Sequence, residues 1–328
     1  MEQIMCDLGY RNIGFPCLVC SNKILGFVIT LLSMIKVCFK LRSGDILIIQ
    51  YPLKKYYTLL CNIVHYRGAK VITLIHDLGS FRRKRLTVLQ EIDRLQNSDY
   101  LITLNDSMSA WLQTKGCEVP KGELKIWDYL SPAIVLNKIE PATDYTVVYA
   151  GALGYNKNRF LYELDRLPRQ WHLSVYGKGL EADKILNKEY FSYNGFLPAD
   201  QLISVQGDFG LVWDGDSYEA CTGNYGEYLR YNNPHKVSLY VRCHLPLIIW
   251  EKAALAPFIK EKEIGICINS LEELDGKLEK LTVDDYFKMK SRVIEISNLL
   301  SVGYFFTKAL DEAVKFLTKS DVADEGRN

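Results

Sequence analysis

The chain has 328 residues, of which 48% are hydrophobic and 24% are charged, a composition typical of a globular protein with room for two cores. Its 40 lysines and arginines nearly balance its 39 aspartates and glutamates, whereas a general nucleic-acid-binding protein carries a basic excess. Nine scattered cysteines predict neither a zinc site nor a disulfide framework, and they favour a reducing, cytoplasmic location.

The first long apolar segment covers residues 24–41. Its uncharged part ends at Lys36, which is short for a membrane span of ~20 apolar residues. The segment also lacks the basic start and the small-residue cleavage site of a signal peptide. We therefore predict a buried helix here, with a helix that touches a membrane as the alternative.

Apolar, strand-like runs joined by helical patterns occupy the rest of the first half. Continuous apolar strands connected by helices are typical of a parallel sheet covered on both faces. After a very short first strand before Asp7, the strands are predicted at 45–52, 69–77, 99–105 and 123–128, with helices at 54–66, 84–96 and 106–115. Asp106 is expected to cap the last of these helices and Gly116 to end it.

Residues 131–145 contain two prolines and no clear periodicity, so they are predicted to link two domains, 1–140 and 141–300. The alternation then restarts, with strands predicted at 146–151, 171–177, 191–196, 208–215, 245–250 and 265–269, and with helices between and after them. The expected fold class is α/β, with two tandem Rossmann-like domains, a cleft between them, and ligands at the carboxyl ends of the strands.

Two strand ends in the second half carry glycines. Gly151 and Gly177 each stand where a strand ends, and glycine there lets backbone amides approach a phosphate. Neither site matches a complete phosphate-binding motif, so a plain strand-to-helix turn is the alternative at each.

The segment GEYLRYNNPHKVSLYVRCHLPLIIW, residues 226–250, passes from polar to almost entirely apolar. Pro234 suits the first turn of a helix, which then contains His235 and Lys236. A helix N-terminus and a lysine both attract an anion, so this turn is a candidate phosphate site. The preceding tyrosines, Tyr225, Tyr228 and Tyr231, could stack on a base or a sugar, or pack the domain edge.

In the first half, His76 and Asp77 stand together at a strand end. A histidine–aspartate pair that faces a cleft is a candidate acid/base pair. The alternative is that Asp77 caps a turn and His76 only packs.

The order of YNNPHK, a helix, the strand LPLIIW and a helix that begins near KAA resembles the donor-site segment of GT-B glycosyltransferases. It is most similar to bacterial galactofuranosyltransferases of the O-antigen type and to streptococcal adhesin glucosyltransferases. GYRNIGFP at residues 9–16 and the His76–Asp77 pair also fit, and the resemblance covers nearly the whole chain.

The resemblance implies a GT-B transferase that moves a sugar, galactofuranose first and glucose second, from a UDP-sugar to a sugar acceptor. The product would be a bacterial surface polysaccharide or glycoprotein, and the reaction would be inverting and metal-independent. A helix at about 301–318 is expected to return to the first domain. The sequence Asp214-Gly215-Asp216 is interpreted as a loop near the donor sugar rather than as a metal site.

The resemblance also implies roles for single residues. Lys236 would bind the diphosphate, Glu251 would contact ribose or sugar hydroxyls, and Asp77 with His76 would be the general base. The remaining residues expected to line the UDP pocket are Gly151, Tyr176, Gly177, Tyr231, Asn232, Asn233, Pro234 and His235. No cofactor other than the UDP-sugar substrate is expected.

Two other functions share this architecture: a two-lobed sugar- or nucleotide-binding protein without catalysis, and a UDP-sugar epimerase. For the transferase, the expected partners are the UDP-sugar and a glycan acceptor that could be lipid-linked, with no nucleic acid. A lipid-linked acceptor would give the basic run 82–85 or the helix at 24–41 a peripheral membrane contact at the inner face of the membrane. The sequence leaves open whether the chain forms a homo-oligomer.

Overall fold

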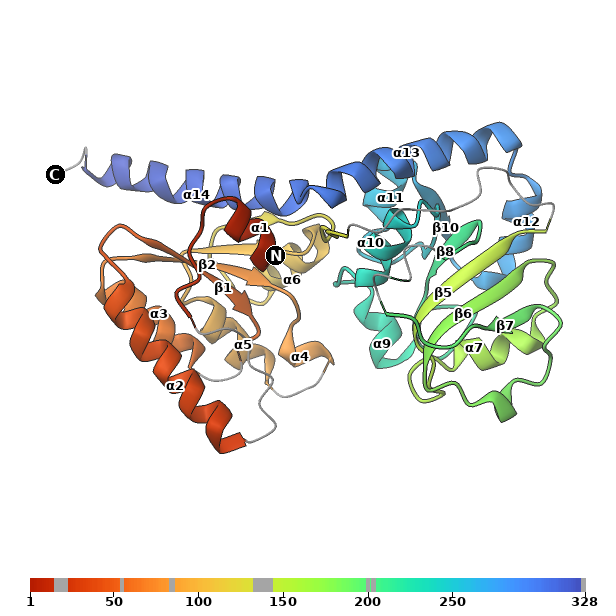
Figure 1. Cartoon of the computed structure of the whole chain (residues 1–328), viewed down its shortest axis with the longest axis horizontal. Coiled ribbons are helices and arrows are strands. Elements are labelled where there is room, and N and C mark those ends of the chain that lie inside the picture. Colours follow the sequence, from red (N-terminus) through yellow and green to blue (C-terminus); the bar gives the residue numbers. More distant parts are fainter. Residues whose placement is uncertain are drawn as a thin grey trace. The chain divides into compact units, whose positions relative to one another are not determined.

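The structure, a computed structural model, describes residues 1–14, 23–53, 56–82, 86–131, 144–198, 201 and 205–325. It consists of two compact units. Unit 1 comprises Met1–Leu124 together with Phe306–Asn328, and unit 2 comprises Lys125–Phe305 (Figure 1). The predicted domain boundary at residues 140 and 141, and residues 83–85 of the basic run 82–85, lie outside the described residues.

Unit 1 contains a four-stranded parallel sheet in the order β1-β2-β3-β4. Its strands are β1 (Ile46–Tyr51), β2 (Lys70–Ile75), β3 (Tyr100–Thr103) and β4 (Lys121–Glu123). Its helices are α1 (Glu2–Asp7), α2 (Lys23–Lys40), α3 (Tyr57–Tyr66), α4 (Gly79–Arg82), α5 (Val88–Leu95), α6 (Asp106–Thr114) and most of α14 (Tyr304–Glu325). The C-terminal helix α14 joins this unit through Lys70, whose Nζ donates a hydrogen bond to the Leu317 carbonyl at 3.1 Å.

Of the five strands predicted for unit 1, those at 45–52, 69–77 and 99–105 are confirmed, and those before Asp7 and at 123–128 are wrong. The run 123–128 leaves the sheet after Glu123, because Lys125 has a left-handed backbone (φ 70°) and Ile126 and Trp127 are buried in unit 2. The expected first strand is the helix α1, since Glu2, Gln3 and other good helix formers outnumber β-branched residues there.

Two details of the predicted helices are also corrected. Asn105, rather than Asp106, caps α6, because its Oδ1 accepts a hydrogen bond from the Met108 amide at 2.9 Å. The helix at 24–41 is present as α2, yet it is not buried, since its Phe39 side chain is 84% exposed.

Unit 2 contains a six-stranded parallel sheet in the order β10-β9-β8-β5-β6-β7, and all six strands predicted for it are confirmed. They are β5 (Thr146–Ala152), β6 (His172–Lys178), β7 (Phe191–Tyr193), β8 (Phe209–Val212), β9 (Leu247–Trp250) and β10 (Gly265–Ile268). The chain runs outward from β5 to β7 and then returns to the other side of β5 at β8. In open α/β sheets, ligands bind beside such a switch point, at the carboxyl ends of the strands.

The helices of unit 2 whose bounds lie within the described residues are α7 (Phe160–Glu163), α9 (Gly223–Tyr228), α10 (His235–Arg242), α11 (Ala256–Lys262), α12 (Leu274–Glu279) and α13 (Val283–Ser301). Helix α10 packs closely on the switch point. Gly210 of β8 lies under the Tyr240 ring, where a Cβ atom would overlap the ring. The Tyr240 hydroxyl accepts a hydrogen bond from the Ala150 amide of β5 at 2.7 Å. These contacts fix α10, and with it Lys236, over β5 and β8.

Among the described residues, no helix combines the length and the apolar character needed to cross a membrane.

Candidate functional site

The carboxyl ends of β5 and β6 approach each other unusually closely. Gly151 and Gly177 are direct partners in the register of the two strands. Gly177 has φ +152°, and a Cβ atom there would overlap the Gly151 carbonyl, so only glycine fits. Gly151 is exposed, and Tyr176 beside it is half-buried. The structure therefore brings together three predicted site residues at an edge where Gly151 is exposed, whereas the Gly177 amide donates to the Gly195 carbonyl at 2.8 Å.

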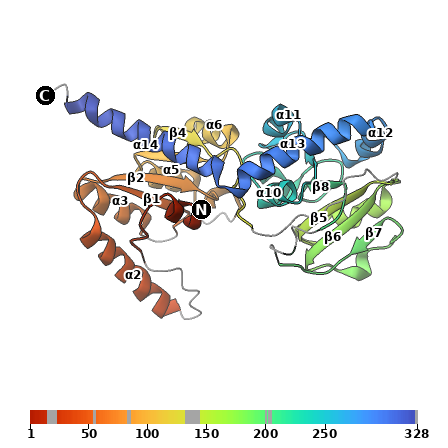
Figure 2. The same ribbon diagram turned by 45° about the horizontal axis from the view of Figure 1, so that its top comes forward.

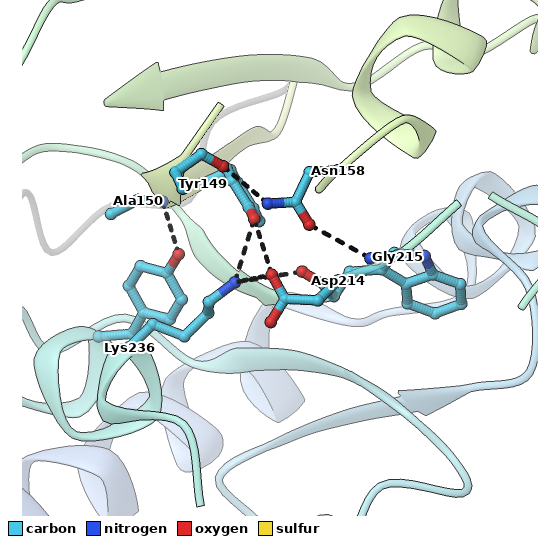
Figure 3. A network of polar contacts seen from close by, with 9 residues as sticks. Tyr149, Ala150, Asn158, Asp214, Gly215 and Lys236 are labelled. Carbon is cyan, nitrogen blue, oxygen red and sulfur yellow. Dashed lines mark hydrogen bonds and ion pairs between the residues drawn. The ribbon is translucent and has the colours of Figure 1, made fainter. Parts of the chain in front are cut away.

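Lys236 lies at the other side of the switch point and is held by three acceptors. Its Nζ donates to Asp214 Oδ1 at 2.9 Å, to the Trp213 carbonyl at 3.1 Å and to the Tyr149 hydroxyl oxygen at 3.2 Å. The Tyr149 hydroxyl donates to the same Asp214 oxygen at 3.0 Å (Figure 3). The ammonium thus has a partner for each of its hydrogen atoms, and an anion must share them or displace one of these acceptors.

This ion pair is largely removed from water. The side chains of Lys236 and Asp214 are 11% and 13% exposed, and Tyr149 is fully buried beneath them. Burial, and then the Asp214 carboxylate, raise the pKa of the Tyr149 hydroxyl well above its ordinary value, so the hydroxyl stays protonated and donates. The Lys236 ammonium also lies 4.3 Å from the centre of the Tyr149 ring.

Asn158 connects the loops that follow β5 and β8. Its side chain is fully buried; Nδ2 donates to the Ala152 carbonyl at 2.7 Å and Oδ1 accepts from the Gly215 amide at 3.2 Å (Figure 3). One amide therefore fixes the glycine-bearing end of β5 against the loop that carries Asp214. This residue was not predicted from the sequence.

The predicted segment YNNPHK does not present one continuous surface. Asn233 is buried, donates from Nδ2 to the Lys125 carbonyl at 3.0 Å, and accepts from Trp127 Nε1 at 2.9 Å. His235 stacks on the Trp127 ring, with 5.0 Å between ring centres. Lys236, next in the chain, faces Asp214 instead. Asn233 and His235 therefore contact residues 125–127, whereas Lys236 faces the strand ends.

The residues at the start of the segment are less enclosed. Tyr231 is half-buried, and Pro234 stands at the N-cap position of α10 with an extended backbone. The Asn232 Oδ1 atom is buried and meets no hydrogen-bond partner among the described residues. A buried amide oxygen without a partner is costly, so Asn232 is the member of this segment best placed to gain from a bound ligand.

Glu251 follows β9 at the same edge of the sheet. Its backbone amide donates to the Ile268 carbonyl at 2.7 Å, and its carboxylate pairs with Lys260 of α11. The carboxylate is one-third exposed and remains open to a further hydroxyl donor.

In unit 1, His76 and Asp77 follow β2 and are both half-buried. The His76 amide donates to the Tyr51 carbonyl at 2.8 Å, which continues the pairing of β1 and β2. Behind this loop lies Glu91, a fully buried carboxylate of α5. It accepts hydrogen bonds from the Tyr51 hydroxyl at 2.8 Å and from the Gly79 and Ser80 amides at 2.7 and 2.9 Å.

Sequence reasoning missed Tyr149, Asn158 and Glu91. Tyr149 lies inside an apolar strand and is indistinguishable there from a core aromatic residue. The one available signal for Glu91 is its place on the apolar face of a short amphipathic helix, beside the buried Ile92 and Leu95.

Among the described residues, no group of three or more histidine, cysteine, aspartate or glutamate side chains forms a metal site. Within the sequence Asp214-Gly215-Asp216, the first carboxylate is paired with Lys236.

Comparison with known proteins identifies the family. Residues 1–126 match the N-terminal domain, and residues 147–313 the C-terminal domain, of proteins described as glucosyltransferase 3-like. The chain belongs to the glucosyltransferase 3-like family.

Two curated relatives are similar along most of the chain. Beta-1,6-galactofuranosyltransferase WbbI of Escherichia coli K12 is 29% identical over 309 residues, which cover 93% of this chain and 90% of WbbI. Glucosyltransferase 3 of Streptococcus gordonii is 28% identical over 283 residues, which cover 83% of this chain and 79% of that protein. The resemblance inferred from YNNPHK and LPLIIW is confirmed.

Among solved structures, Anabaena Alr3699/HepE in complex with UDP has a TM-score of 0.59 at 11% identity, covering 87% of this chain and 84% of that one. The lipopolysaccharide outer core galactosyltransferase WaaB has a TM-score of 0.54 at 13% identity, covering 89% and 82%. The fold of this glucosyltransferase 3-like chain is therefore GT-B, as predicted, and the chain is a glycosyltransferase.

Proposed function

We propose that unit 2 binds a UDP-sugar at the carboxyl edge of its sheet and that the enzyme transfers the sugar to an acceptor glycan. The observation that carries this proposal is the nearly buried Lys236–Asp214 pair beside the switch point between β5 and β8. The UDP and UDP-glucose held by the structural neighbour HepE support the same class of donor.

In this proposal, the diphosphate binds between the glycine-bearing strand ends and the start of α10. The exposed backbone at Gly151 accommodates phosphate oxygens, with Gly177 packed beneath it, and the dipole of α10 adds to the charge of Lys236. Both stabilise the charge that develops on the leaving UDP, with no metal ion required. Tyr176, Tyr231, Asn232, Asn233, Pro234 and His235 line or support the pocket, and Glu251 accepts from ribose or sugar hydroxyls.

Unit 1 supplies the acceptor side of the reaction. Asp77, with His76 beside it, removes the proton of the attacking hydroxyl, and direct displacement of UDP inverts the anomeric centre. Galactofuranose is the first choice of donor sugar and glucose the second, a ranking that the names of the two relatives support. The acceptor would be a glycan of a surface polysaccharide such as O-antigen or of a glycoprotein, lipid-linked and reached from the cytoplasmic side of the membrane.

The donor site is tested by thermal unfolding with UDP, UDP-galactofuranose and UDP-glucose, each with and without EDTA. We expect UDP to raise the Tm of the wild-type enzyme equally in both conditions. Lys236→Gln alone leaves the Asp214 carboxylate unpaired, so the matched variant is the double substitution Lys236→Gln/Asp214→Asn, which removes both charges. Both variants should lose the UDP-induced shift.

Lys262→Gln is the control, because Lys262 lies on α11 of the same unit, pairs with Glu261 rather than with a residue of the proposed pocket, and has a side chain that is 39% exposed. It should retain the shift. Absence of a shift with every uracil nucleotide would contradict the donor site, and a shift that EDTA abolishes would contradict the metal-free site. Interconversion of UDP-sugars in the absence of an acceptor would identify an epimerase instead.

A further inference from the structure

Among the described residues, helix α2 presents an apolar face that is partly exposed. Its outward side chains Leu25, Val28, Leu31, Leu32 and Ile35 are between 39% and 51% exposed, and Phe39 is 84% exposed. At ~100° per residue these six positions fall within one arc of about 120°. The helix packs on unit 1 through another face, where Met34 and Val37 are buried. We call the six exposed residues the α2 stripe.

The stripe lies at the surface of unit 1. Figure 1 and Figure 2 both show α2 at the periphery of the unit, beside α3. Helix α3 adds two exposed apolar side chains, Leu59 at 48% and Tyr66 at 90%. An apolar surface of this size on a water-soluble domain marks a place of contact with something else.

The segment of the chain that carries the α2 stripe is basic in sequence. Residues 8–76 contain nine lysines and arginines and a single acid, Asp45, although the whole chain has a net charge of only +1. Lys36 and Lys40 follow one edge of the α2 stripe on the helical wheel; Lys36 is half-buried and donates to the Gly14 carbonyl at 2.9 Å, whereas Lys40, and Arg42 just beyond the helix, are exposed. The chain is nearly neutral as a whole, but the segment that contains α2 and α3 has a strong excess of basic residues.

We propose that α2 lies flat on an anionic lipid bilayer, with the α2 stripe at the boundary between headgroups and acyl chains and with Lys40 and Arg42 near the lipid phosphates. An apolar stripe flanked by lysine, with no acid in the helix, is the pattern of helices that bind in this plane. Each basic residue near such a surface adds attraction that salt weakens.

A second copy of the chain fits this surface less well. A symmetric pair joined through α2 would bring two basic segments together, and each copy offers only Asp45 within residues 8–76 to offset them. The bilayer assignment rests on α2 and its charge alone. It holds or fails independently of the donor site and of the proposed base.

The test is flotation of the full chain with vesicles of phosphatidylglycerol and phosphatidylcholine, and with vesicles of phosphatidylcholine alone, at low and high salt. The wild-type chain should float with the anionic vesicles at low salt and less at high salt. Leu32→Ser/Phe39→Ser removes two exposed apolar side chains without touching the core, and should lower partitioning at least about tenfold. Lys40→Gln/Arg42→Gln should lower it as well and flatten its salt dependence.

Leu89→Ser is the matched control, because Leu89 is an exposed leucine (73%) of α5 in the same unit. It should float like the wild-type chain, and all variants should keep the wild-type Tm. The proposal is overturned if the wild-type chain does not float with anionic vesicles, or if Leu32→Ser/Phe39→Ser floats equally well. A dimer in sedimentation velocity that this variant makes monomeric, without flotation of the wild-type chain, would assign the stripe to a second copy.

Discussion

Two of the three acceptors of Lys236 are side chains, the Asp214 carboxylate and the fully buried Tyr149, and they are hydrogen-bonded to each other. The Tyr149 hydroxyl donates to Asp214 and accepts from Lys236, so it fixes the geometry of the ion pair from below. A nearly buried pair is stable only if its remaining hydrogen-bonding capacity is satisfied. The position of the ammonium before a ligand arrives therefore depends on Tyr149.

Tyr149→Phe removes this hydroxyl and leaves the ring in place. A hydrogen bond to a charged group contributes roughly 1.5–3 kcal/mol, so the free energy of unfolding should fall by about that amount. Lys236 and Asp214 keep each other as partners, so a UDP-induced Tm shift should remain. Urea unfolding measures the free energy of unfolding, and Tyr66→Phe, which changes a 90% exposed side chain, is the control. Equal stability of Tyr149→Phe and the wild-type chain would show that the network does not hold the pair.

The sequence predicted Lys236 and its helix start, but not its surroundings. The motif NPHK is local, and proline before a helix is a strong signal. Tyr149 and Asp214 precede Lys236 by 87 and 22 residues, and their approach depends on the strand order around β5 and β8. Spacing along the sequence does not show which residues approach each other in space. The partners of a predicted site residue can therefore be named only once the strand order is known.

At the scale of elements, the loop after β2 is held from behind by α5. Glu91 joins three donors, two from the backbone of α4 and one from Tyr51 of β1. Burial and the neighbouring Glu91 raise the pKa of the Tyr51 hydroxyl, which therefore stays a donor. The carboxylate thus fixes α4 against β1, immediately after the position of Asp77.

Glu91→Ala leaves these donors without an acceptor in a buried site. Each unsatisfied donor costs about 1–3 kcal/mol, so the loss of unfolding free energy should exceed about 3 kcal/mol. Glu91→Gln keeps one acceptor oxygen, so its free energy of unfolding should fall by less than that of Glu91→Ala. Asp93→Asn, on the exposed side of the same helix, should lose nothing measurable. If Glu91→Ala unfolded like the wild-type chain, the loop would be held by other contacts.

Element prediction succeeded where apolar runs were long and failed where they were short. Five of the six strands of unit 2 are four to seven residues long, most with an apolar centre and clear breaks, and all six were found. The run KIW was read as strand from its apolar residues, but these residues pack outside the sheet. Trp127 donates to the Asn233 carbonyl, and its own carbonyl accepts from the Ser238 hydroxyl at 2.6 Å. Contacts with residues more than 100 positions later in the sequence therefore determined the conformation of this segment.

At the scale of the whole molecule, two parallel sheets with separate cores form two units, and composition and alternation were sufficient to predict two such domains. The structural division at Lys125 could not be read from the chain. The prolines at 132 and 141 indicated a linker, whereas the residues before them already pack with α10.

In the proposed reaction, the two units have different roles. If Asp77 of unit 1 is the base and unit 2 holds the nucleotide, the two functions can be lost separately. Asp77→Asn keeps the size of the side chain but cannot accept a proton, so sugar transfer should fall by roughly 10²–10⁴-fold. The UDP-induced Tm shift should stay at the wild-type value, because no residue of the proposed donor pocket is changed.

Two quantities are measured on the same preparations: the initial rate of sugar transfer from UDP-galactofuranose or UDP-glucose, and the Tm shift caused by UDP. Asp93→Asn, an exposed aspartate of unit 1, should retain both activities. Transfer at the wild-type rate in Asp77→Asn would exclude it as the base and turn attention to His76. Loss of the UDP shift in this variant would mean that unit 1 takes part in nucleotide binding, because a change confined to proton transfer leaves donor affinity unaltered.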